Sequence, residues 1–303
     1  MPEISVCMPA FNARPWIEAA IKSLQSQTLR DFELIVVDDG STDSTGEFVE
    51  SIADPRFRVV RQPNAGTGAA MNRCIAEARS PLLARLDADD IAHPDRLMRQ
   101  LAFMQANPEV VVVGTQFRFL VSDRIIPAPR VPLDHDEIVA AFLERRGAMC
   151  NSSLVMRTAT VRDAGGCQFP LPGEDIDLCL RLSQRGRVAN IPEVLQQYRL
   201  HEQSAVFRFA EPILMGHAFA IRCFRCRANG EPEPTVEGFT TDWARRPLLV
   251  RLSDWRMQRS TQNYRRSLIR RAQGRRVSAA AQHAVAAVYR PVAAIKKLAG
   301  GVS

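Results

Sequence analysis

Residues 33–43 read ELIVVDDGSTD, an apolar run that ends in a cluster of acidic, glycine and hydroxyl residues. The apolar run is rich in Leu, Ile and Val, which is typical of a buried strand. The polar cluster after it is typical of the start of a helix, where hydroxyl and acidic side chains cap free backbone N–H groups. The segment therefore predicts a strand over 33–38 and a helix over 44–52.

The same alternation surrounds this segment on both sides. Short apolar runs predict three further strands, over 4–9, 57–62 and 82–87. Amphipathic segments over 16–27 and 68–78 predict helices between these strands. Strands that alternate with helices and are apolar almost throughout form parallel sheets whose two faces are covered. We therefore predict an α/β fold with a mostly parallel sheet flanked by helices.

Each of the four predicted strands is followed by a short polar loop. The loops read PAFN, DDGS, NAG and DADD, over 9–12, 38–41, 64–66 and 87–90. The carboxyl ends of parallel strands lie at one edge of the sheet, and open α/β sheets bind their ligands there. Four such loops therefore predict a binding site at that edge.

Acidic residues dominate this predicted edge. Carboxylates that lie close together repel one another unless a cation lies among them or some of them are protonated. Mg²⁺ or Mn²⁺, which bridge protein carboxylates to substrate phosphates, would suit such a set. For any single acid after a strand, a turn-forming or helix-capping role is the alternative. The acids are Asp38, Asp39, Asp87, Asp89 and Asp90.

Composition and motifs disfavour several other classes of protein. Hydrophobic residues make up 46% and charged residues 24% of the 303 residues, which is ordinary for a globular protein and unlike a disordered or fibrous chain. No apolar stretch is long enough to span a membrane, and the start lacks the pattern of a cleaved signal peptide. Neither a dinucleotide-binding glycine motif nor a P-loop motif is present. Without a secretory signal, the seven cysteines predict reduced thiols in a cytosolic protein.

Five motifs, taken in order, resemble those of the family 2 glycosyltransferases. The resemblance covers about residues 3–205, and VDDGSTD together with LDADD makes it specific. It implies the GT-A fold, which binds a nucleotide sugar, with Mn²⁺ or Mg²⁺ as the cofactor. The motifs are SVCMPAFNA (5–13), IVVDDGSTD (35–43), NAGTGAAMN (64–72), LDADDIAHPDRL (86–97) and GEDIDLCLRL (173–182).

The resemblance implies where the nucleotide binds. It places Pro9, Phe11 and Asn12 in the loop that touches the base and the ribose. It also makes Asp39 the acid that accepts the base N–H, which suits a uracil or thymine ring. A UDP-sugar is therefore the expected donor.

The third loop adds Gly66 and Asn72 to the implied nucleotide site, with one departure from the family pattern. Relatives often carry an Arg just before this Asn, whereas this chain has Met71. A phosphate or base contact expected at that position would have to come from another cation, such as Arg85 or Arg73.

The resemblance also implies that LDADD contains the DxD motif, which binds the ribose and the metal. Asp87 would meet the ribose next to Ala88, and Asp89 would bind the metal, with Asp90 beside it or in its place. His201 matches a position where some relatives carry a His near the metal, so it is a further candidate ligand. For a lone His, a structural or surface position is the alternative.

Sugar transfer also needs a group that accepts the proton of the acceptor hydroxyl. The loop over 163–175 delivers Glu174 and Asp175 to a predicted helix over 176–185, whose positive dipole end favours ionised carboxylates. By resemblance to the ED motif of the family, Asp175 is the base with Glu174 beside it, and the anomeric centre is inverted. The alternative is that these two acids only cap the helix.

Charge divides the chain into an acidic body and a basic tail. Residues 1–244 carry 26 basic and 32 acidic side chains, whereas the chain from Arg245 onward carries 14 basic side chains and one acid. A basic amphipathic helix with Leu248, Leu252 and Trp255 on one face suits an anionic membrane surface. The alternative is a charged face that covers the acidic body.

These patterns divide the chain into three parts. We predict a donor-binding half over 1–115, an acceptor and catalytic half of the same domain over 116–209, and a helical Arg-rich region over 210–303. A polar segment over 228–242 predicts a linker. The other elements predicted before residue 210 are a strand over 110–121, a helix over 136–144 and a strand over 151–157.

The sequence as a whole predicts a metal-dependent inverting glycosyltransferase. It would move a sugar from a nucleotide donor to a saccharide or glycolipid acceptor in the synthesis of cell-surface polysaccharide or glycolipid. We expect it in the cytoplasm, at the inner face of the cell membrane. The alternatives are a metal-dependent phosphotransfer or receiver-type protein, which would leave GEDIDL unexplained, and a nucleic-acid binder. Nucleic acid is not expected as a partner, because the acidic body offers no platform of basic and aromatic side chains.

Overall fold

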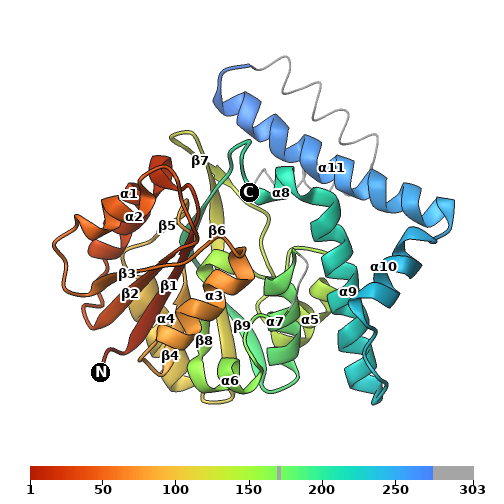
Figure 1. Ribbon diagram of the computed structural model, residues 1–303, viewed down its shortest axis with the longest axis horizontal. Helices are drawn as coiled ribbons and strands as arrows, with labels where there is room; N and C mark the ends of the chain where they lie inside the picture. Colours follow the sequence, from red (N-terminus) through yellow and green to blue (C-terminus); the bar gives the residue numbers. More distant parts are fainter. Residues whose placement is uncertain (169–171, 276–303) are drawn as a thin grey trace. The chain divides into compact units, whose positions relative to one another are not determined.

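In the computed structural model, which describes residues 1–168 and 172–275, the first four strands pair as their apolar runs predict. β1 pairs with β2 and with β4, and β2 pairs with β3, all in parallel. Every residue of β2 is buried, as expected for a strand in a sheet that is covered on both faces. The strands are β1 (Ile4–Ala10), β2 (Phe32–Asp38), β3 (Phe57–Arg61) and β4 (Leu82–Arg85) (Figure 1).

Side chains of β1 alternate between two covered faces of the sheet, because successive residues of a strand point to opposite sides. Val6 and Met8 lie in the same core cluster as the apolar face of α1. Cys7, between them, lies beside Cys74 of α3, whose thiol donates to the Ile35 carbonyl (3.7 Å). The predicted helices between the strands are confirmed as α1 (Arg14–Gln25), α2 (Thr45–Glu50) and α3 (Thr67–Glu77).

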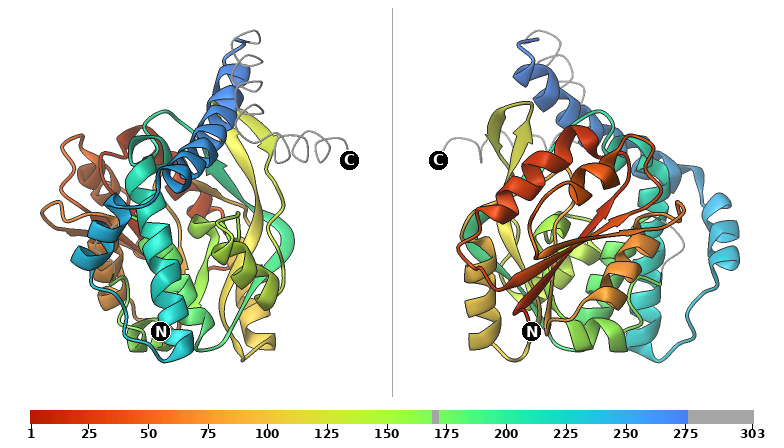
Figure 2. Two further views of the ribbon diagram at one scale, coloured as in Figure 1. Left: turned by 90° about the vertical axis from the view of Figure 1, so that its right-hand side faces the viewer. Right: turned by 60° about the vertical axis from the view of Figure 1, so that its left-hand side comes forward.

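The parallel order ends at β4, and antiparallel pairs follow it. β8 pairs antiparallel with β4 and with β6, and β5 pairs antiparallel with β9. The described strands form one sheet in the order β3-β2-β1-β4-β8-β6-β9-β5, with β7 paired to β6 (Figure 2). The predicted α/β class is confirmed. The later strands are β5 (Ile91–Ala92), β6 (Val110–Val121), β7 (Arg124–Pro127), β8 (Val155–Arg157) and β9 (Arg187–Arg199).

Two later strands depart from the sequence pattern. The predicted strand over 151–157 is wrong in its first part, because Asn151–Ser153 form a 3₁₀ turn, η1. The Ser153 hydroxyl stabilises this turn by donating to the Cys150 carbonyl (2.8 Å). β9 was not predicted because its sequence, RVANIPEVLQQYR, has neither a long apolar run nor a regular alternation of buried and exposed residues.

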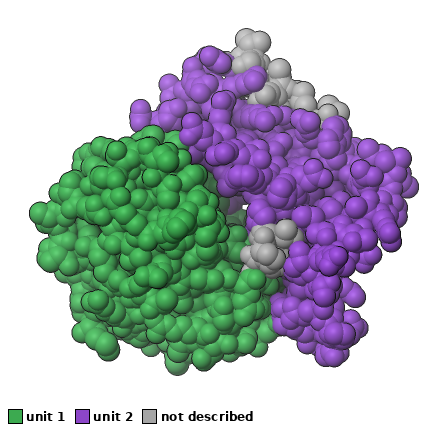
Figure 3. All heavy atoms as spheres, viewed as in Figure 1, with its two compact units in different colours: residues 1–118, 130–170, 174–198 green, residues 119–129, 171–173, 199–303 purple. Residues whose placement is uncertain are grey.

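The chain divides into two units, drawn in green and purple in Figure 3. Unit 1 comprises residues 1–118, 130–170 and 174–198, and unit 2 comprises residues 119–129, 171–173 and 199–303. The division at residues 115 and 209 into donor, acceptor and C-terminal parts concerns function and stays a prediction. The remaining helices of unit 1 are α4 (Arg96–Ala106), α5 (His135–Leu143), α6 (Thr158–Asp163) and α7 (Glu174–Ser183).

Unit 2 is mainly helical over its described residues. The predicted linker over 228–242 is wrong at both ends, because α9 continues to Asn229 and α10 begins at Val236. α10 forms although its sequence is polar, since the Phe239 ring packs 4.9 Å from that of Phe219 and the Thr235 hydroxyl caps its start. The helices are α8 (Ala205–Arg208), α9 (Ala210–Asn229), α10 (Val236–Ala244) and α11 (Leu248–Ala272).

The predicted C-terminal region is helical as far as it is described, and its residues 276–303 lie outside the described residues. Among the described helices, none combines the length and the apolar content needed to cross a bilayer. All seven cysteines fall in the described chain, where each is buried and none forms a disulfide bond.

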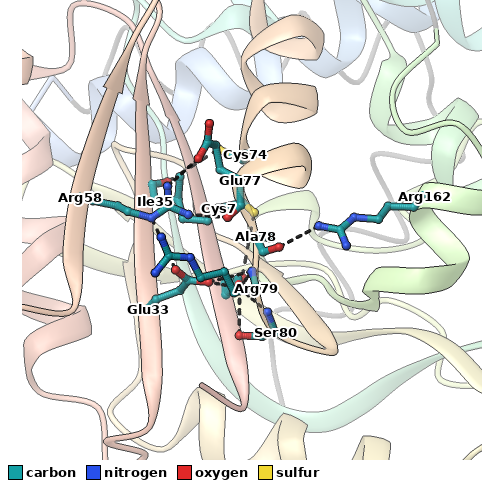
Figure 4. Close-up of polar contacts among 11 residues, drawn as sticks. Cys7, Glu33, Ile35, Arg58, Cys74, Glu77, Ala78, Arg79, Ser80 and Arg162 are labelled. Atoms are coloured by element: carbon teal, nitrogen blue, oxygen red, sulfur yellow. Dashed lines mark hydrogen bonds and ion pairs between the residues drawn. The ribbon is translucent and has the colours of Figure 1, made fainter. Parts of the chain in front are cut away.

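A polar cluster around Glu33 fixes the strand ends at the amino edge of the parallel sheet (Figure 4). The Glu33 carboxylate accepts from the Ser5 hydroxyl (2.6 Å) and from the Arg79 backbone N–H (2.9 Å). Arg58 lies 3.5 Å from Glu33 and 2.8 Å from Glu77 at the end of α3. These contacts hold the connection from α3 to β4, and thereby the register of the strand that carries the DADD loop at the opposite edge.

Candidate functional site

The loops after β1 and β2 are joined by hydrogen bonds through Asn12. Its backbone N–H donates to the Ser41 hydroxyl (2.9 Å), and its side-chain oxygen accepts from the Thr42 N–H (2.9 Å). Asn12 has a φ of 49°, in the left-handed region that Asn tolerates better than most residues. Phe11 is 48% exposed beside it, and Pro9 is the next-to-last residue of the buried strand β1. Two of the predicted base-binding segments therefore form one connected surface.

Asp39 organises the loop after β3. Its carboxylate is buried and accepts from the Gln62 side chain (2.7 Å) and from the backbone N–H groups of Ala65 (3.0 Å) and Gly66 (2.8 Å). Gly66 has a φ of +89°, a conformation that strongly favours glycine. The predicted contact of Asp39 with a nucleotide base stays a prediction. In the structure this carboxylate also has a structural role, because its hydrogen bonds hold the loop that leads into α3.

Asn72 on α3 holds the segment that leads to the ED motif. Its side-chain N–H donates to the Cys167 carbonyl (2.7 Å), and its side-chain oxygen accepts from the Cys167 N–H (2.7 Å). Gly166 approaches so closely that a Cβ there would lie 2.5 Å from the Asn72 oxygen. Met71, which replaces the Arg of the family pattern, is buried. Asn72 was predicted to bind nucleotide, and that role stays a prediction beside this structural one.

Arg85 is a buried cation at the end of β4, next to the DADD loop. Its Nε donates to the Asp87 carboxylate (2.8 Å), and the Asp87 N–H donates to the Ser152 hydroxyl (2.9 Å). With its amide oriented to satisfy both groups, Asn151 accepts from both terminal nitrogens of Arg85 (2.9 Å each). The η1 turn that interrupts the predicted strand thus supplies two polar partners to this loop. Arg73, the other candidate cation, is exposed and pairs with Glu77.

Electrostatic interactions connect Arg85 with the ED motif. Burial alone would lower the pKa of Arg85, but the neighbouring charges of Asp87, Glu174 and Asp175 raise it above its ordinary value. Burial raises the pKa of both Asp87 and Asp175, and Arg85 opposes that rise. The DxD motif and the ED motif, predicted from separate stretches of sequence, therefore share one buried cation.

α7 presents Glu174 and Asp175 in its first turn, where the helix dipole favours carboxylates. A Cβ at Gly68, in the first turn of α3, would lie 3.6 Å from Glu174, so these two helix starts are adjacent. Asp177, in the same turn, is buried and pairs with Arg181 (2.7 Å). Arg181 in turn donates to backbone carbonyls in the segment before α7, so Asp177 has a structural task.

The three predicted metal ligands differ in their surroundings. Asp89 is half-buried, whereas Asp90 is fully buried, and its charge raises the pKa of the neighbouring Arg96 against the lowering effect of burial. His201 belongs to unit 2, where its backbone N–H donates to the Ser204 hydroxyl (3.3 Å). Among the described residues no three His, Cys, Asp or Glu side chains are grouped to hold a metal. An ion that takes one or two carboxylates and completes its shell with substrate phosphates and water fits Asp89.

Arg96 was missed as a residue that supports the site. It has no exposed surface, and burial lowers its pKa to about 10. Its side chain donates to Gln100 (3.0 Å), Gln196 (3.0 Å) and the backbone carbonyl of Arg85 (2.6 Å). An Arg on an amphipathic helix ordinarily predicts a solvated position, so only the coincidence of Arg96 and Gln100 on the apolar face of α4 could have indicated a buried network.

Residues 5–162 match the family model described as Glycosyl transferase family 2. The chain is 31% identical over 222 residues to the putative glycosyltransferase EpsE of Bacillus subtilis (strain 168), covering 68% of this chain and 76% of EpsE. It is 32% identical over 193 residues to the amylovoran biosynthesis glycosyltransferase AmsE of Erwinia amylovora, covering 60% of this chain and 70% of AmsE.

Two solved structures share the fold. Residues 1–349 of S. aureus TarS, in complex with UDP, superpose with a TM-score of 0.58 at 19% identity, over 96% of this chain and 92% of that one. The mannosyltransferase PcManGT from Pyrobaculum calidifontis, in complex with GDP-Man and Mn²⁺, gives a TM-score of 0.57 at 18% identity, over 99% of this chain and 79% of that one. At these identities the likeness concerns the fold, which is the predicted GT-A architecture.

The family match, the two curated relatives and the order of motifs at one edge of the sheet agree with one another. The chain belongs to glycosyl transferase family 2 and is a glycosyltransferase.

Proposed function

We propose that the protein transfers a sugar from a UDP-sugar to a hydroxyl group of a saccharide or glycolipid acceptor, with inversion at the anomeric carbon. The observation that carries the proposal is the buried Arg85, which binds Asp87 of the DxD motif and lies in the field of Glu174 and Asp175. The proposed donor-binding acid, Asp87, and the proposed base for the acceptor, Asp175, would therefore both lie close to Arg85.

The donor would lie along the connected loops at the carboxyl edge of the sheet. In this proposal Pro9, Phe11 and Asn12 contact the base and the ribose, and Asp39 accepts the base N–H. The exposed ring of Phe11 and the ordered turn at Asn12 support this role. Gly66 and Asn72 would line the same region from α3, and Asp87 with Ala88 would lie under the ribose.

A divalent ion, Mn²⁺ or Mg²⁺, would be held by Asp89, with Asp90 and His201 as further candidates. When bound, it would neutralise charge that develops on the departing diphosphate. Asp89 is accessible enough to take part, since its side chain is half-buried. The full burial of Asp90 next to Arg96 favours a supporting role for that carboxylate.

Asp175 would act as the base, with Glu174 beside it. As the acceptor oxygen forms its bond to the anomeric carbon and the bond to the diphosphate breaks, the hydroxyl proton passes to the Asp175 carboxylate. Burial raises the pKa of Asp175, which makes the carboxylate a stronger proton acceptor, while Arg85 and the start of α7 favour its ionised form. One displacement of this kind inverts the anomeric centre.

Membership of the family argues against a phosphotransfer or receiver-type protein and against a non-enzymatic nucleic-acid binder. The similarity to EpsE and to AmsE, whose name places it in amylovoran biosynthesis, supports a role in cell-surface polysaccharide or glycolipid synthesis. We propose that the enzyme works in the cytoplasm at the inner face of the cell membrane, where a lipid-linked acceptor would be held.

A screen of sugar nucleotides tests this proposal. The purified chain should bind UDP, as measured by titration calorimetry, and should release UDP from at least one UDP-sugar when Mn²⁺ or Mg²⁺ is present. Tighter binding of GDP than of UDP would contradict the donor assignment. Transfer that retains the anomeric configuration, read by NMR of the product, would contradict the single displacement.

A further inference from the structure

The first half of α11 exposes a stripe of large apolar side chains. Leu248, Leu252 and Trp255 follow one another at i, i+4 and i+7, so they lie along one side of the helix. Their exposed fractions are 67%, 45% and 43%. Large contiguous apolar surface of this kind marks an interaction site more often than it marks ordinary protein surface.

Arginines surround this stripe. At 100° per residue, Arg251 and Arg256 lie on opposite sides of it, and Arg259 continues it one turn further on. All three are exposed, and the Arg259 guanidinium lies 5.7 Å from the centre of the Trp255 ring. We call these three arginines, together with Leu248, Leu252 and Trp255, the α11 face.

The second half of α11, and the one acid of the helix, differ from this face. The second half of the helix is anchored within unit 2, because Asn263, Leu268 and Ile269 are buried and the helix contacts α9. Asp254, the one acid from Arg245 onward, points away from the stripe and pairs with Arg246. The α11 face therefore carries positive charge with no carboxylate among its own residues.

We propose that the α11 face binds the surface of a membrane that contains anionic phospholipids. The helix would lie in the interface, with Leu248, Leu252 and Trp255 entering the boundary between headgroups and acyl chains. The flanking arginines would reach the lipid phosphates while their aliphatic stems remain along the apolar stripe. This inference goes beyond the proposed function and does not depend on sugar transfer.

Two other occupants fit the observations less well. In a symmetric dimer the same face meets itself, so the arginines of two copies would repel one another across the contact. Nucleic acid would satisfy the arginines, but it would leave the exposed leucines without an apolar partner. An anionic lipid surface satisfies the charges and the apolar stripe together.

Cosedimentation of the full chain with vesicles tests the proposal. We expect binding to vesicles of phosphatidylcholine mixed with phosphatidylglycerol, weaker binding in high salt, and little binding to phosphatidylcholine alone. Replacing Arg251, Arg256 and Arg259 with Gln should weaken binding by on the order of a hundredfold. The matched control replaces the exposed arginines Arg30, Arg99 and Arg118 with Gln, removes the same charge, and should change binding by less than about threefold.

A second variant tests the apolar stripe. Leu252→Gln with Trp255→Gln should weaken vesicle binding at least about tenfold, whereas Ile125→Gln, at an exposed apolar residue on β7, should not. UDP binding and the circular dichroism spectrum should stay unchanged in every variant, so a loss of vesicle binding is not a loss of folding. Equal binding to neutral vesicles, indifference to both α11 variants, loss of a dimer in the apolar variant, or displacement of vesicles by tRNA would each overturn the proposal.

Discussion

Asp175 lies in the first turn of α7. The charge of Arg85 acts on both Asp175 and Asp87. Replacing Asp175 with Asn keeps the shape and the capping ability of the side chain but removes its basic oxygen. We expect turnover to fall by about 10²- to 10⁴-fold. The affinity for UDP should barely change, because the proposed base acts on the acceptor. Steady-state kinetics and calorimetric titration of UDP measure the two quantities separately.

The control for this variant follows from the surroundings of the neighbouring acids. Asp177 is unsuitable, because its buried ion pair with Arg181 makes Asp177→Asn a folding variant as well. Asp163→Asn, at the exposed end of α6, removes an acid from the same half of the fold and should keep nearly full activity. An Asp175→Asn enzyme that loses UDP affinity in step with its rate would assign Asp175 to the donor site instead.

Asp89 carries the proposed metal contact. Asp89→Asn should weaken UDP binding by on the order of tenfold or more when Mn²⁺ is present, because one charged ligand of the ion is lost. In the presence of a chelator the variant and the unchanged protein should bind UDP alike. Asp123→Asn, in the exposed turn between β6 and β7, serves as the control. UDP affinity that is the same with and without divalent ions in the unchanged protein would remove the metal from the proposal.

At the scale of elements, α3 and the segment before α7 are held together by a contact that leaves no room for a side chain. Gly166 has a φ of +64°, and a Cβ there would lie 2.5 Å from the Asn72 oxygen. Gly166→Ala should therefore lower the free energy of unfolding by about 1–3 kcal/mol. Because the same segment leads to Asp175 and Asn72 is proposed to line the donor site, the variant should also turn over more slowly and bind UDP less tightly.

Gly147→Ala is the matched substitution. A Cβ at Gly147 would meet nothing within 4 Å, so this variant should be as stable as the unchanged protein or slightly more stable. Urea unfolding of both variants measures the difference. Equal stability of the two variants would mean that the Asn72 side chain can move away from the new methyl group without lowering the free energy of unfolding.

The elements also show which parts of the fold the sequence reveals. β1 to β4 and α1 to α3 were predictable because each strand is mainly apolar and each helix has one apolar face. β9 was not, because its burial follows contacts with distant strands and not a local period. α10 was missed for a related reason: its stability depends on the Phe239 contact with α9, and its own composition is that of a loop.

The candidate site was predictable to a similar extent. The acids of LDADD and GED could be identified from the sequence because of the resemblance of their motifs to the family, which favours a site over the turn-forming and capping roles that such acids also have. Their common partner could not: Arg85 sits on a strand, and only the three-dimensional structure brings it to Asp87 and into the field of Asp175. The double role of Asn72 was equally hidden, because its partner Cys167 is 95 residues away in the chain.

For the whole molecule, the buried acids make stability depend on pH. Burial raises the pKa of Asp175 above its ordinary value, so the folded protein holds this proton more tightly than the unfolded chain does. The stability that this carboxyl contributes is full below its unfolded pKa of about 4 and is lost as the pH rises through the raised pKa. Above that raised pKa, the ionised group therefore destabilises the fold relative to a neutral one.

Asp175→Asn should consequently have a higher melting temperature than the unchanged protein at pH 7. The difference should shrink as the pH is lowered towards 4, where Asp175 itself becomes neutral. Differential scanning calorimetry across this range measures it. A variant that melts lower than the unchanged protein at pH 7 would show that the attraction of Asp175 to the charge of Arg85 outweighs the cost of burial.

The burial of every cysteine has a practical consequence for spectroscopy. Burial and neighbouring groups raise the pKa of Cys7, Cys150 and Cys179, and raise that of Cys167 to about 12, so thiolate, the form that alkylating reagents attack, is scarce in the native protein. A single cysteine introduced on an exposed helix would therefore take up a fluorophore or a spin label almost alone. The native thiols would not react until the chain unfolds. The rate of their alkylation would then measure the rate at which the core unfolds.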